Sequence, residues 1–314
     1  MSEAVILLAG PTASGKSALA LAIAEEFGGI VVNADSMQVY RELRVLTARP
    51  TPEEEARVPH RLYGVLSAAE ACSAGRWRDM ALAAIAAAHR AGQVPIVVGG
   101  TGLYFRVLTE GLAPVPPVPE AVRAAARAAF ARLGEDRFRA ALAARDPVMA
   151  ARLKPGDRQR LIRAYEVIEA TGTSLADWQS LPPEGPGLAG PAFTLVMEPE
   201  RQILYARCDA RLDRMIAEGA LDEVRGLMDL GLDPDLPAMK ALGVPDLGRH
   251  LAGEIDLETA VSRAKTQTRR YAKRQGTWFR NQIRDGFVVS AQDLESLKKE
   301  IFPKICEFLL TGYP

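Results

Sequence analysis

The stretch that decides the fold is Gly10-Pro11-Thr12-Ala13-Ser14-Gly15-Lys16-Ser17. It follows a short apolar run at residues 5–9, which predicts a buried strand, and it precedes an Ala- and Leu-rich helical segment at 17–27. The octapeptide matches G-x-x-x-x-G-K-[ST] in the strand–turn–helix context that this phosphate-binding loop, the P-loop, requires. Backbone N–H groups and Lys16 can hold a diphosphate or nucleotide, and the Ser17 hydroxyl is placed to ligate Mg²⁺. The loop predicts phosphate binding, which is a weaker statement than nucleotide hydrolysis.

Strands and helices alternate on both sides of a helical block. Further strands are predicted at 30–34, 62–66, 95–98, 193–198 and 287–291, with helices at 76–91, from 201 to about 281, and at 294–310. This alternation favours a parallel sheet covered by helices. Pro-rich segments at 112–119 and 181–191 bracket residues 120–179, which are predicted to be helical throughout. We therefore expect an α/β fold, a P-loop-type parallel sheet flanked by helices, with an all-helical insertion at 118–189 between core segments 1–117 and 190–314.

The composition is that of an ordinary globular protein. The 314 residues are 48% hydrophobic, and 39 basic residues balance 39 acidic ones. This balance excludes a chain that is basic throughout, but it allows a local basic surface. Three cysteines and three histidines lie scattered, which argues against a disulfide framework or a zinc cluster. No targeting segment and no apolar stretch of about 18 residues is visible, so we expect a cytoplasmic protein without a membrane partner.

Polar residues follow the second and fourth predicted strands. Asp35, Ser36, Met37 and Gln38 come after the second, and the fourth ends in Gly99-Gly100-Thr101. Because parallel strands direct their carboxyl ends to one edge of the sheet, these side chains are expected beside the phosphate-binding loop. A carboxylate there can accept a proton or hold a metal through water, although Asp35 alone could equally be a turn residue. Gly99 stands where a nucleotidase would usually carry an aspartate.

Two further regions are rich in basic donors. In the helical block, Arg160 and Arg163 lie three residues apart and so share a helix face, and Arg123 follows the first Pro-rich segment. A solvated helix face is the alternative interpretation, and for Arg123 alone it is the better one. Residues 263–284 carry eight basic residues and no acidic one, which predicts a polyanion-binding surface. Tyr271, Gln275 and Trp278 recur there at helical spacing, which is typical of a core-facing stripe.

Taken together, these segments resemble the tRNA dimethylallyltransferase (isopentenyltransferase) family along nearly the whole chain. The resemblance is carried by GPTASGKS, NADSMQVYR, GGTGLY, DRQRLIRAYEVIEATG, DRMIAEGALDEVRGL and TRRYAKRQGTWFR. It implies transfer of a dimethylallyl group from dimethylallyl diphosphate, with Mg²⁺, to the exocyclic amine of the adenosine beside the tRNA anticodon. Asp35 would then be the general base, with Thr101 and Arg123 beside the reacting centre. Contacts to tRNA would come from Asp35, Ser36, Met37 and Gln38, from Gln159, Arg160, Leu161, Ile162 and Arg163 of an anticodon-loop clamp, and from Lys273 and Arg274.

Two other functions remain open from the residues alone. A P-loop kinase of a small metabolite would share the phosphate-binding loop, but it leaves the basic segment 263–284 unexplained. A non-catalytic RNA-binding protein that uses a nucleotide as a switch would explain that segment, but not the grouping of Asp35 with Thr101. ATP can bind through its phosphates in all three cases. We expect a monomer that acts on tRNA.

Overall fold

Six strands form one parallel sheet in the order β3-β2-β4-β1-β5-β6 in the computed structural model, which describes residues 3–183, 185, 187–290 and 293–312. The strand β1 lies inside the sheet between β4 and β5, and all five of its residues are buried. Burial on both faces explains why the sequence there is continuously apolar instead of alternating. The predicted fold class is confirmed. The strands are β1 (Val5–Ala9), β2 (Gly29–Asn33), β3 (His60–Arg61), β4 (Val94–Gly99), β5 (Ala192–Met197) and β6 (Phe287–Val289).

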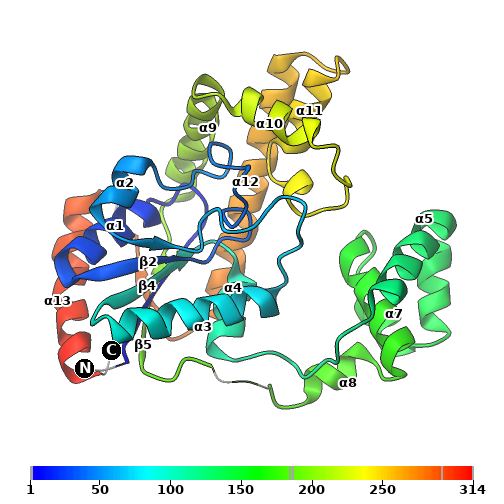
Figure 1. The fold of residues 1–314 in the computed structure, drawn as a ribbon, viewed down its shortest axis with the longest axis horizontal. Coiled ribbons are helices and arrows are strands. Elements are labelled where there is room, and N and C mark those ends of the chain that lie inside the picture. Colours follow the sequence, from blue (N-terminus) through cyan, green and yellow to red (C-terminus); the bar gives the residue numbers. More distant parts are fainter. Residues whose placement is uncertain (1–2, 184, 186, 291–292, 313–314) are drawn as a thin grey trace. The chain divides into compact units, whose positions relative to one another are not determined.

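Helices cover both faces of the sheet (Figure 1). On one face, α1 packs against β4, β2 and β1, and α13 packs against α1 and, through Phe308 on Phe193, against β5. On the other face, α3 and α4 pack against β2, β4 and β1. The helices of this core unit are α1 (Lys16–Phe27), α2 (Pro52–Arg57), α3 (Ala74–Arg90), α4 (Gly102–Thr109), α9 (Arg201–Ala217), α10 (Ala220–Asp229), the 3-10 helix η1 (Ala238–Lys240), α11 (Val244–Leu251), α12 (Leu257–Gln282) and α13 (Leu294–Thr311).

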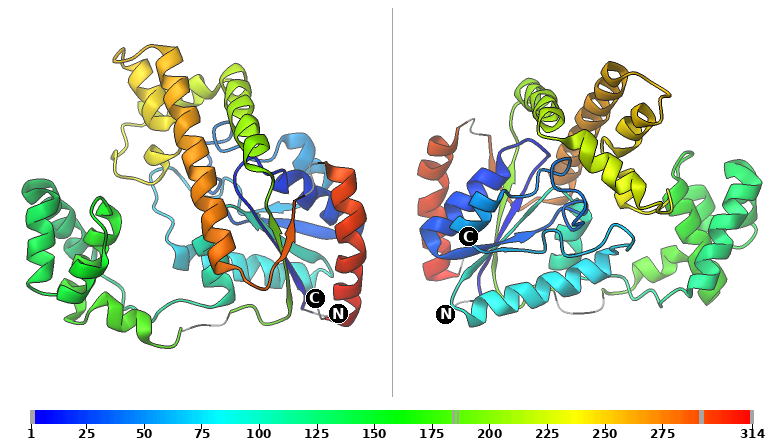
Figure 2. Two further views of the ribbon diagram at one scale, coloured as in Figure 1. Left: turned by 180° about the vertical axis from the view of Figure 1, so that it is seen from behind. Right: turned by 45° about the horizontal axis from the view of Figure 1, so that its top comes forward.

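The long helix α12 runs beside α9 and α11 and also contacts α4 (Figure 2). Its start is fixed by Asp256, whose carboxylate accepts a hydrogen bond from the Thr259 N–H at 2.6 Å. One stripe of the helix is buried and consists mostly of small side chains, which let α12 lie close to its neighbours. The stripe comprises Ala260, Ala264, Thr268, Ala272, Gln275 and Phe279.

The chain divides into two compact units, the core unit of Met1–Thr109 with Gly187–Pro314, and a helical unit of Glu110–Pro186. The helical unit has its own apolar core, which includes Phe138, Leu142 and Leu161. It carries no strand among its described residues, and its helical sequence is broken at several points, for example at Gly134 (φ 72°) within α5. Its helices are α5 (Glu120–Ala143), α6 (Pro147–Arg152), α7 (Arg158–Thr171) and α8 (Leu175–Ser180).

The predicted third strand is wrong. Residues 62–66 are not a strand; the pairing lies just before them, where His60 and Arg61 pair with Val31 and Val32. Leu62 then takes a left-handed conformation (φ 65°), which ends the extended chain, and Leu66 makes an isolated bridge with Tyr40. The last predicted strand is shorter than expected, because β6 ends at Val289; residue 291 of that prediction lies outside the described residues.

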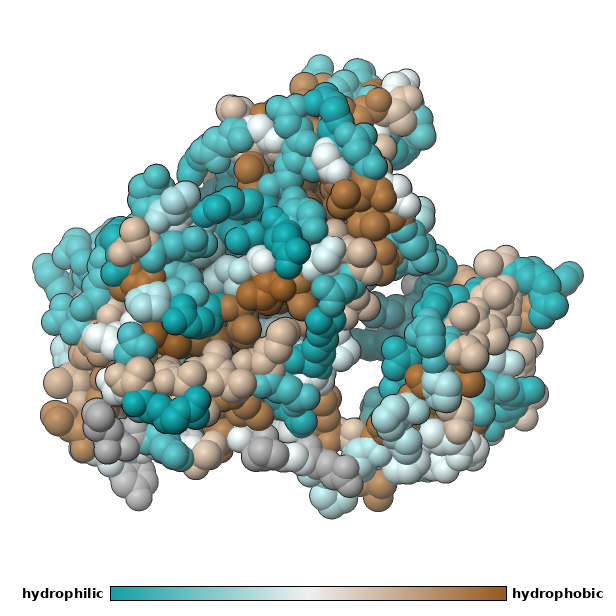
Figure 3. Space-filling model, viewed as in Figure 1, coloured by the Kyte–Doolittle hydropathy of each residue, from teal (hydrophilic) through white to brown (hydrophobic). Residues whose placement is uncertain are grey.

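Hydrophobic residues on the face drawn in Figure 3 occur in separate groups among hydrophilic ones. In the described part of the chain, none of the helices has the length and apolar character needed to cross a membrane.

Candidate functional site

The phosphate-binding loop, residues 10–17, joins β1 to the start of α1. Two of its residues are left-handed, Ala13 (φ 62°) and Gly15 (φ 93°), and this conformation turns the chain around the helix N-terminus. Space at Gly10 is tight, since a Cβ there would lie 3.0 Å from the Met197 Cβ at the end of β5. Ser14 Oγ is buried and has no hydrogen-bond partner among the described residues. A bound anion would supply one, so the loop fits a phosphate ligand.

Lys16 lies in the first turn of α1 and points back along the loop. Its Nζ donates a hydrogen bond to the Pro11 carbonyl at 3.1 Å. Burial lowers the pKa of Lys16 to about 8, and the positive charge of Arg211 acts in the same direction, whereas the Asp35 carboxylate opposes both. The buried surroundings therefore disfavour the protonated form of Lys16, and a bound anion would stabilise it.

Arg211, on α9, joins the loop from 199 residues away, and the sequence motifs did not identify it. Its guanidinium donates a hydrogen bond to Thr12 Oγ1. Burial lowers the pKa of Arg211, while Cys208 and Asp35 raise it. A cavity of about 380 Å³ opens beside Ser17, and four arginines line part of it, namely Arg44, Arg49, Arg211 and Arg214. Glu54 and Glu218 also line the cavity, so its arginines outnumber its carboxylates, which favours an anionic ligand.

Asp35 emerges from the end of β2 in a fixed turn. Asn33 holds this turn from both sides, since its Oδ1 accepts from the Asp35 N–H at 2.8 Å and its Nδ2 donates to the Asp35 carbonyl at 3.0 Å. The Asp35 carboxylate accepts from the Met37 N–H at 2.9 Å. Its charge raises the pKa of both Lys16 and Arg211, so the carboxylate lies within electrostatic reach of the two cations at the phosphate loop.

Thr101 ties the end of β4 to the loop that carries Asp35. Its N–H donates to the Ala34 carbonyl at 3.2 Å, and its hydroxyl accepts from the Ser36 N–H at 2.9 Å. The two loops touch at Gly99, where a Cβ would lie only 2.1 Å from the Ala34 carbonyl oxygen. Residue 99, where a nucleotidase would usually carry an aspartate, therefore has no room for a side chain. Ser36 Oγ also lies 3.3 Å from Thr101 Oγ1.

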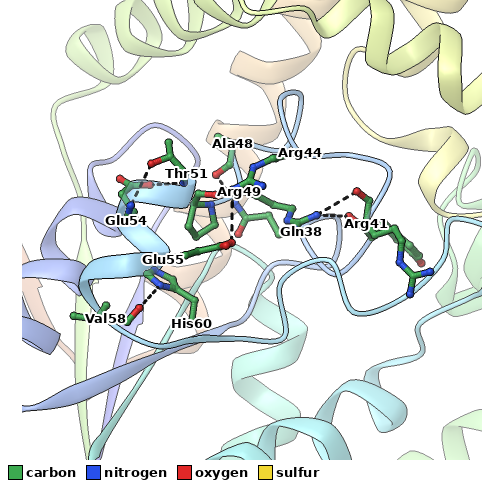
Figure 4. A network of polar contacts seen from close by, with 12 residues as sticks. Gln38, Arg41, Arg44, Ala48, Arg49, Thr51, Glu54, Glu55, Val58 and His60 are labelled. Carbon is green, nitrogen blue, oxygen red and sulfur yellow. Dashed lines mark hydrogen bonds and ion pairs between the residues drawn. The ribbon is translucent and has the colours of Figure 1, made fainter.

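Gln38 is held in place by its own loop (Figure 4). Its side-chain amide donates to the carbonyls of Thr47 and Ala48 at 2.8 and 2.9 Å. That loop is in turn bound by Glu223 of α10, whose carboxylate accepts from three consecutive N–H groups, at residues 44–46. The structure thus brings residues 10–17, 35–38 and 101 to one edge of the sheet, with Arg211 as an addition that sequence reasoning missed.

The basic segment of α12 is only partly available to a ligand. Lys265 pairs with Asp213, Arg269 with Asp209, and Arg280 with Glu198. Two of these pairs join α12 to α9 and the third joins it to the segment after β5, so these three charges are neutralised within the fold. No ion pair is formed among the described residues by Arg263, Arg270, Lys273, Arg274 and Arg284. All five are exposed, and all but Arg284 lie on α12. Lys273 and Arg274 thus remain candidates for binding a polyanion.

The remaining predicted residues lie in the helical unit. Gln159 and Arg160 are exposed on the first turn of α7, and Arg160 lies 3.5 Å from Asp157. Arg163 is partly buried and pairs with Glu166 at 3.3 Å. Leu161 and Ile162 belong to the apolar core, so their side chains pack inside the unit and do not face a ligand. Arg123 is in the first turn of α5, and its buried Nε has no hydrogen-bond partner in the described part of the chain.

The candidate metal site has few protein ligands. Within residues 3–183, 185, 187–290 and 293–312, no group of three or more His, Cys, Asp or Glu side chains could hold a metal ion. Ser17 is exposed at the start of α1, which follows β1, whereas Asp35 follows β2, and β4 lies between these two strands. One hydroxyl and one carboxylate suit Mg²⁺ where phosphate oxygens and water complete its coordination. The residues present therefore fit Mg²⁺ that arrives with a phosphate ligand.

Comparison with known proteins identifies the family. The model of the family described as "IPP transferase" matches residues 38–282, and that of "Isopentenyl transferase" matches residues 3–71. The chain belongs to the IPP transferase family. This confirms the resemblance stated from the motifs, and it supports neither the small-metabolite kinase nor the RNA-binding switch.

Relatives match this chain over most of its length. It is 55% identical over 311 residues to the tRNA dimethylallyltransferase of Paramagnetospirillum magneticum, which covers 99% of this chain and 98% of the relative. It is 61% identical to that of Rhodospirillum centenum over 89% of each chain. Among solved structures, a eukaryotic dimethylallyltransferase acting on tRNA matches with a TM-score of 0.83 at 26% identity, over 100% of this chain and 81% of the other. The tRNA isopentenylpyrophosphate transferase of Bacillus halodurans matches with a TM-score of 0.71 at 32% identity, over 97% and 96%.

Proposed function

We propose that this IPP transferase moves the dimethylallyl group of dimethylallyl diphosphate onto the N6 amine of the adenosine next to the anticodon of tRNA. The observation that carries the proposal is that β1, β2 and β4 of one parallel sheet bring the phosphate loop, Asp35 and Thr101 to the same edge, where Thr101 is hydrogen-bonded to the loop that carries Asp35. A proton acceptor thus stands beside a site for a diphosphate leaving group. The relatives are named tRNA dimethylallyltransferases, which supplies the substrates.

In the proposed reaction, the N6 nitrogen forms a bond to C1 of the dimethylallyl group as the bond from C1 to the diphosphate oxygen breaks. The electron pair of that bond leaves with the diphosphate, and Asp35 accepts the proton that N6 loses. Loop N–H groups, Lys16 and Arg211 stabilise the negative charge on the departing diphosphate. Thr101 keeps the Asp35 loop in place through Ser36. Arg123 of the helical unit is proposed as a further catalytic residue.

We propose that Ser17 and Asp35 would hold Mg²⁺ together with the diphosphate. When bound, it supplies further positive charge for the leaving group.

The adenosine must leave the base stack of the loop to reach this site. We propose that the helical unit, 118–189 in the sequence-based division, clamps the anticodon loop with Gln159, Arg160 and Arg163. Action in the cytoplasm and as a monomer stays a prediction.

The direct test is mass spectrometry of tRNA nucleosides after incubation with dimethylallyl diphosphate. We expect a mass gain of one dimethylallyl group on an adenosine next to the anticodon, and equimolar release of diphosphate. Unchanged nucleosides with several tRNAs and added Mg²⁺ would contradict the proposal.

The exposed cations of α12 are predicted to bind tRNA phosphates and not bases. Replacing Lys273 or Arg274 by alanine should weaken binding to all tRNAs about equally and reduce the salt dependence, the slope of log K against log salt concentration, by about one unit. Filter-binding titrations at several salt concentrations measure this slope. Lys265→Ala is the matched control, because Lys265 is already paired with Asp213 at 2.7 Å. An unchanged slope with relaxed tRNA specificity would mean that these side chains read bases.

ATP is predicted to compete with dimethylallyl diphosphate without being consumed. Its phosphates offer the loop the same oxygens, but residue 99 lies too close to Ala34 to carry the carboxylate that organises Mg²⁺ for hydrolysis. Increasing ATP should raise the apparent KM for the donor and leave kcat unchanged. Phosphate release from ATP is measured in parallel with prenyl transfer, with and without tRNA. Stoichiometric ATP hydrolysis during turnover would overturn this prediction.

A further inference from the structure

Gln275 is a buried amide on the helix that carries the exposed cations of the proposed tRNA surface. Only 6% of the residue is exposed, and both ends of its amide are used. Its Oε1 accepts from the Thr12 N–H at 2.9 Å, and its Nε2 donates to the Gly100 carbonyl at 2.8 Å. Thr12 belongs to the phosphate loop after β1, and Gly100 to the loop after β4. The Gln275 side chain therefore joins the phosphate-binding loop to the loop that carries Thr101.

The fit around this amide is close. A Cβ at Gly100 would lie 2.1 Å from the Gln275 Nε2, so residue 100 can carry no side chain while the amide is present. Thr12 is held from its other end by Arg211, which donates to its hydroxyl. One turn before Gln275, burial and the Asp35 charge raise the pKa of Tyr271. Gln275 thus lies at the centre of the contacts between the two loops.

An amide is the side chain that this place requires. It has an acceptor and a donor on one rigid plane, which match the N–H of Thr12 and the carbonyl of Gly100. A carboxylate would turn an oxygen toward the Gly100 carbonyl, and an apolar side chain would leave both backbone groups buried without a partner. Both polar atoms of the amide are taken up by the protein, so we expect Gln275 to make no hydrogen bond to either proposed substrate.

We propose that Gln275 is a positioning residue of the transfer reaction. It sets the spacing between the phosphate-binding loop and the loops after β2 and β4, which carry Asp35 and Thr101. This proposal rests on the proposed function. In a displacement between two bound partners, the reacting atoms must be held at about 3–3.5 Å, and a misplacement of about 1 Å can cost 10²-fold in rate. Gln275 fixes both loops to α12 and thereby fixes that distance.

The first test is Gln275→Glu, measured as single-turnover prenyl transfer at saturating tRNA and donor. We expect a rate about 10- to 100-fold below that of the unchanged enzyme at pH 8, while tRNA affinity changes less than about threefold. At lower pH the introduced carboxyl becomes protonated and can again donate to Gly100 while it accepts from Thr12. The ratio of variant rate to unchanged rate should therefore rise as pH falls. A ratio that is constant with pH, or close to one throughout, would overturn the proposal.

A second pair of variants keeps the test independent of folding losses. Gly100→Ala should strongly impair transfer because its methyl group meets the amide, and Gly100→Ala combined with Gln275→Ala should recover part of the lost rate. If the double variant is no better than Gly100→Ala alone, the close contact is not what limits the reaction. Thermal unfolding of each protein identifies variants that merely unfold. Absence of transfer by the unchanged enzyme would instead contradict the proposed function itself.

Discussion

Asp35→Asn lowers the rate of prenyl transfer by about 10²- to 10⁴-fold, the range for the loss of a general base. The substitution keeps the shape of the side chain and an oxygen for the Met37 N–H, which donates to the carboxylate at 2.9 Å. The backbone bonds between Asp35 and Asn33 do not depend on the charge. We therefore expect an intact loop, unchanged tRNA affinity and a defect in the chemical step.

The charge of Asp35 has a second effect that the experiment must separate from proton transfer. It raises the pKa of Lys16, so its removal leaves Lys16 less protonated and weakens donor binding at high pH. Single-turnover rates are therefore compared at pH 7 with saturating donor, where this effect is small. Asp285→Asn, at an exposed position after α12, is the matched control. A near-normal rate for Asp35→Asn under these conditions would remove Asp35 from the role of base.

Local patterns predicted the fold where a strand is buried along its whole length. Apolar runs bounded by glycine gave β1 and β4 to within one residue, at Val5–Ala9 and Val94–Gly99. The third strand was misplaced because β3 is only two residues long and lies at the edge of the sheet, where few apolar side chains are needed. The left-handed Leu62 could not be foreseen, since a leucine rarely adopts that conformation.

The candidate site was predictable where it is built from strand ends, because topology alone brings those ends to one edge. Arg211 and Gln275 escaped prediction because they contact Thr12 across 199 and 263 residues of chain. Gln275 nevertheless left a signal, since it lies on the core-facing stripe that the helical spacing predicted. A polar residue on a buried stripe needs a partner, and here it has two. Leu161 and Ile162 show the opposite error, in which a motif was assigned to an interface although two of its members form a core.

Removing the positive charge of Lys16 should be nearly as damaging as removing the base. Lys16→Met keeps a long unbranched side chain without the charge, and we expect kcat/KM for dimethylallyl diphosphate to fall by about 10²- to 10³-fold. The physical reason is that Lys16 meets the negative charge that grows on the diphosphate as the carbon–oxygen bond breaks. Lys299→Met, on an exposed part of α13, is the control for loss of a lysine as such.

The pH dependence of donor binding shows whether Lys16 is the cation concerned. Burial lowers its pKa to about 8 in the free enzyme, and a bound diphosphate favours the protonated form. Below pH 8 the lysine is already charged, so affinity is constant; above pH 8 binding must take up a proton, and affinity falls by up to about tenfold per pH unit. Calorimetric titration with inorganic diphosphate in two buffers of different ionisation enthalpy measures both the affinity and the proton uptake. The diphosphate exchanges protons of its own, so the comparison is between the unchanged enzyme and Lys16→Met. In the variant the additional uptake above pH 8 should vanish and the affinity should be weak. If the two proteins take up the same number of protons at each pH, Lys16 does not govern the diphosphate site.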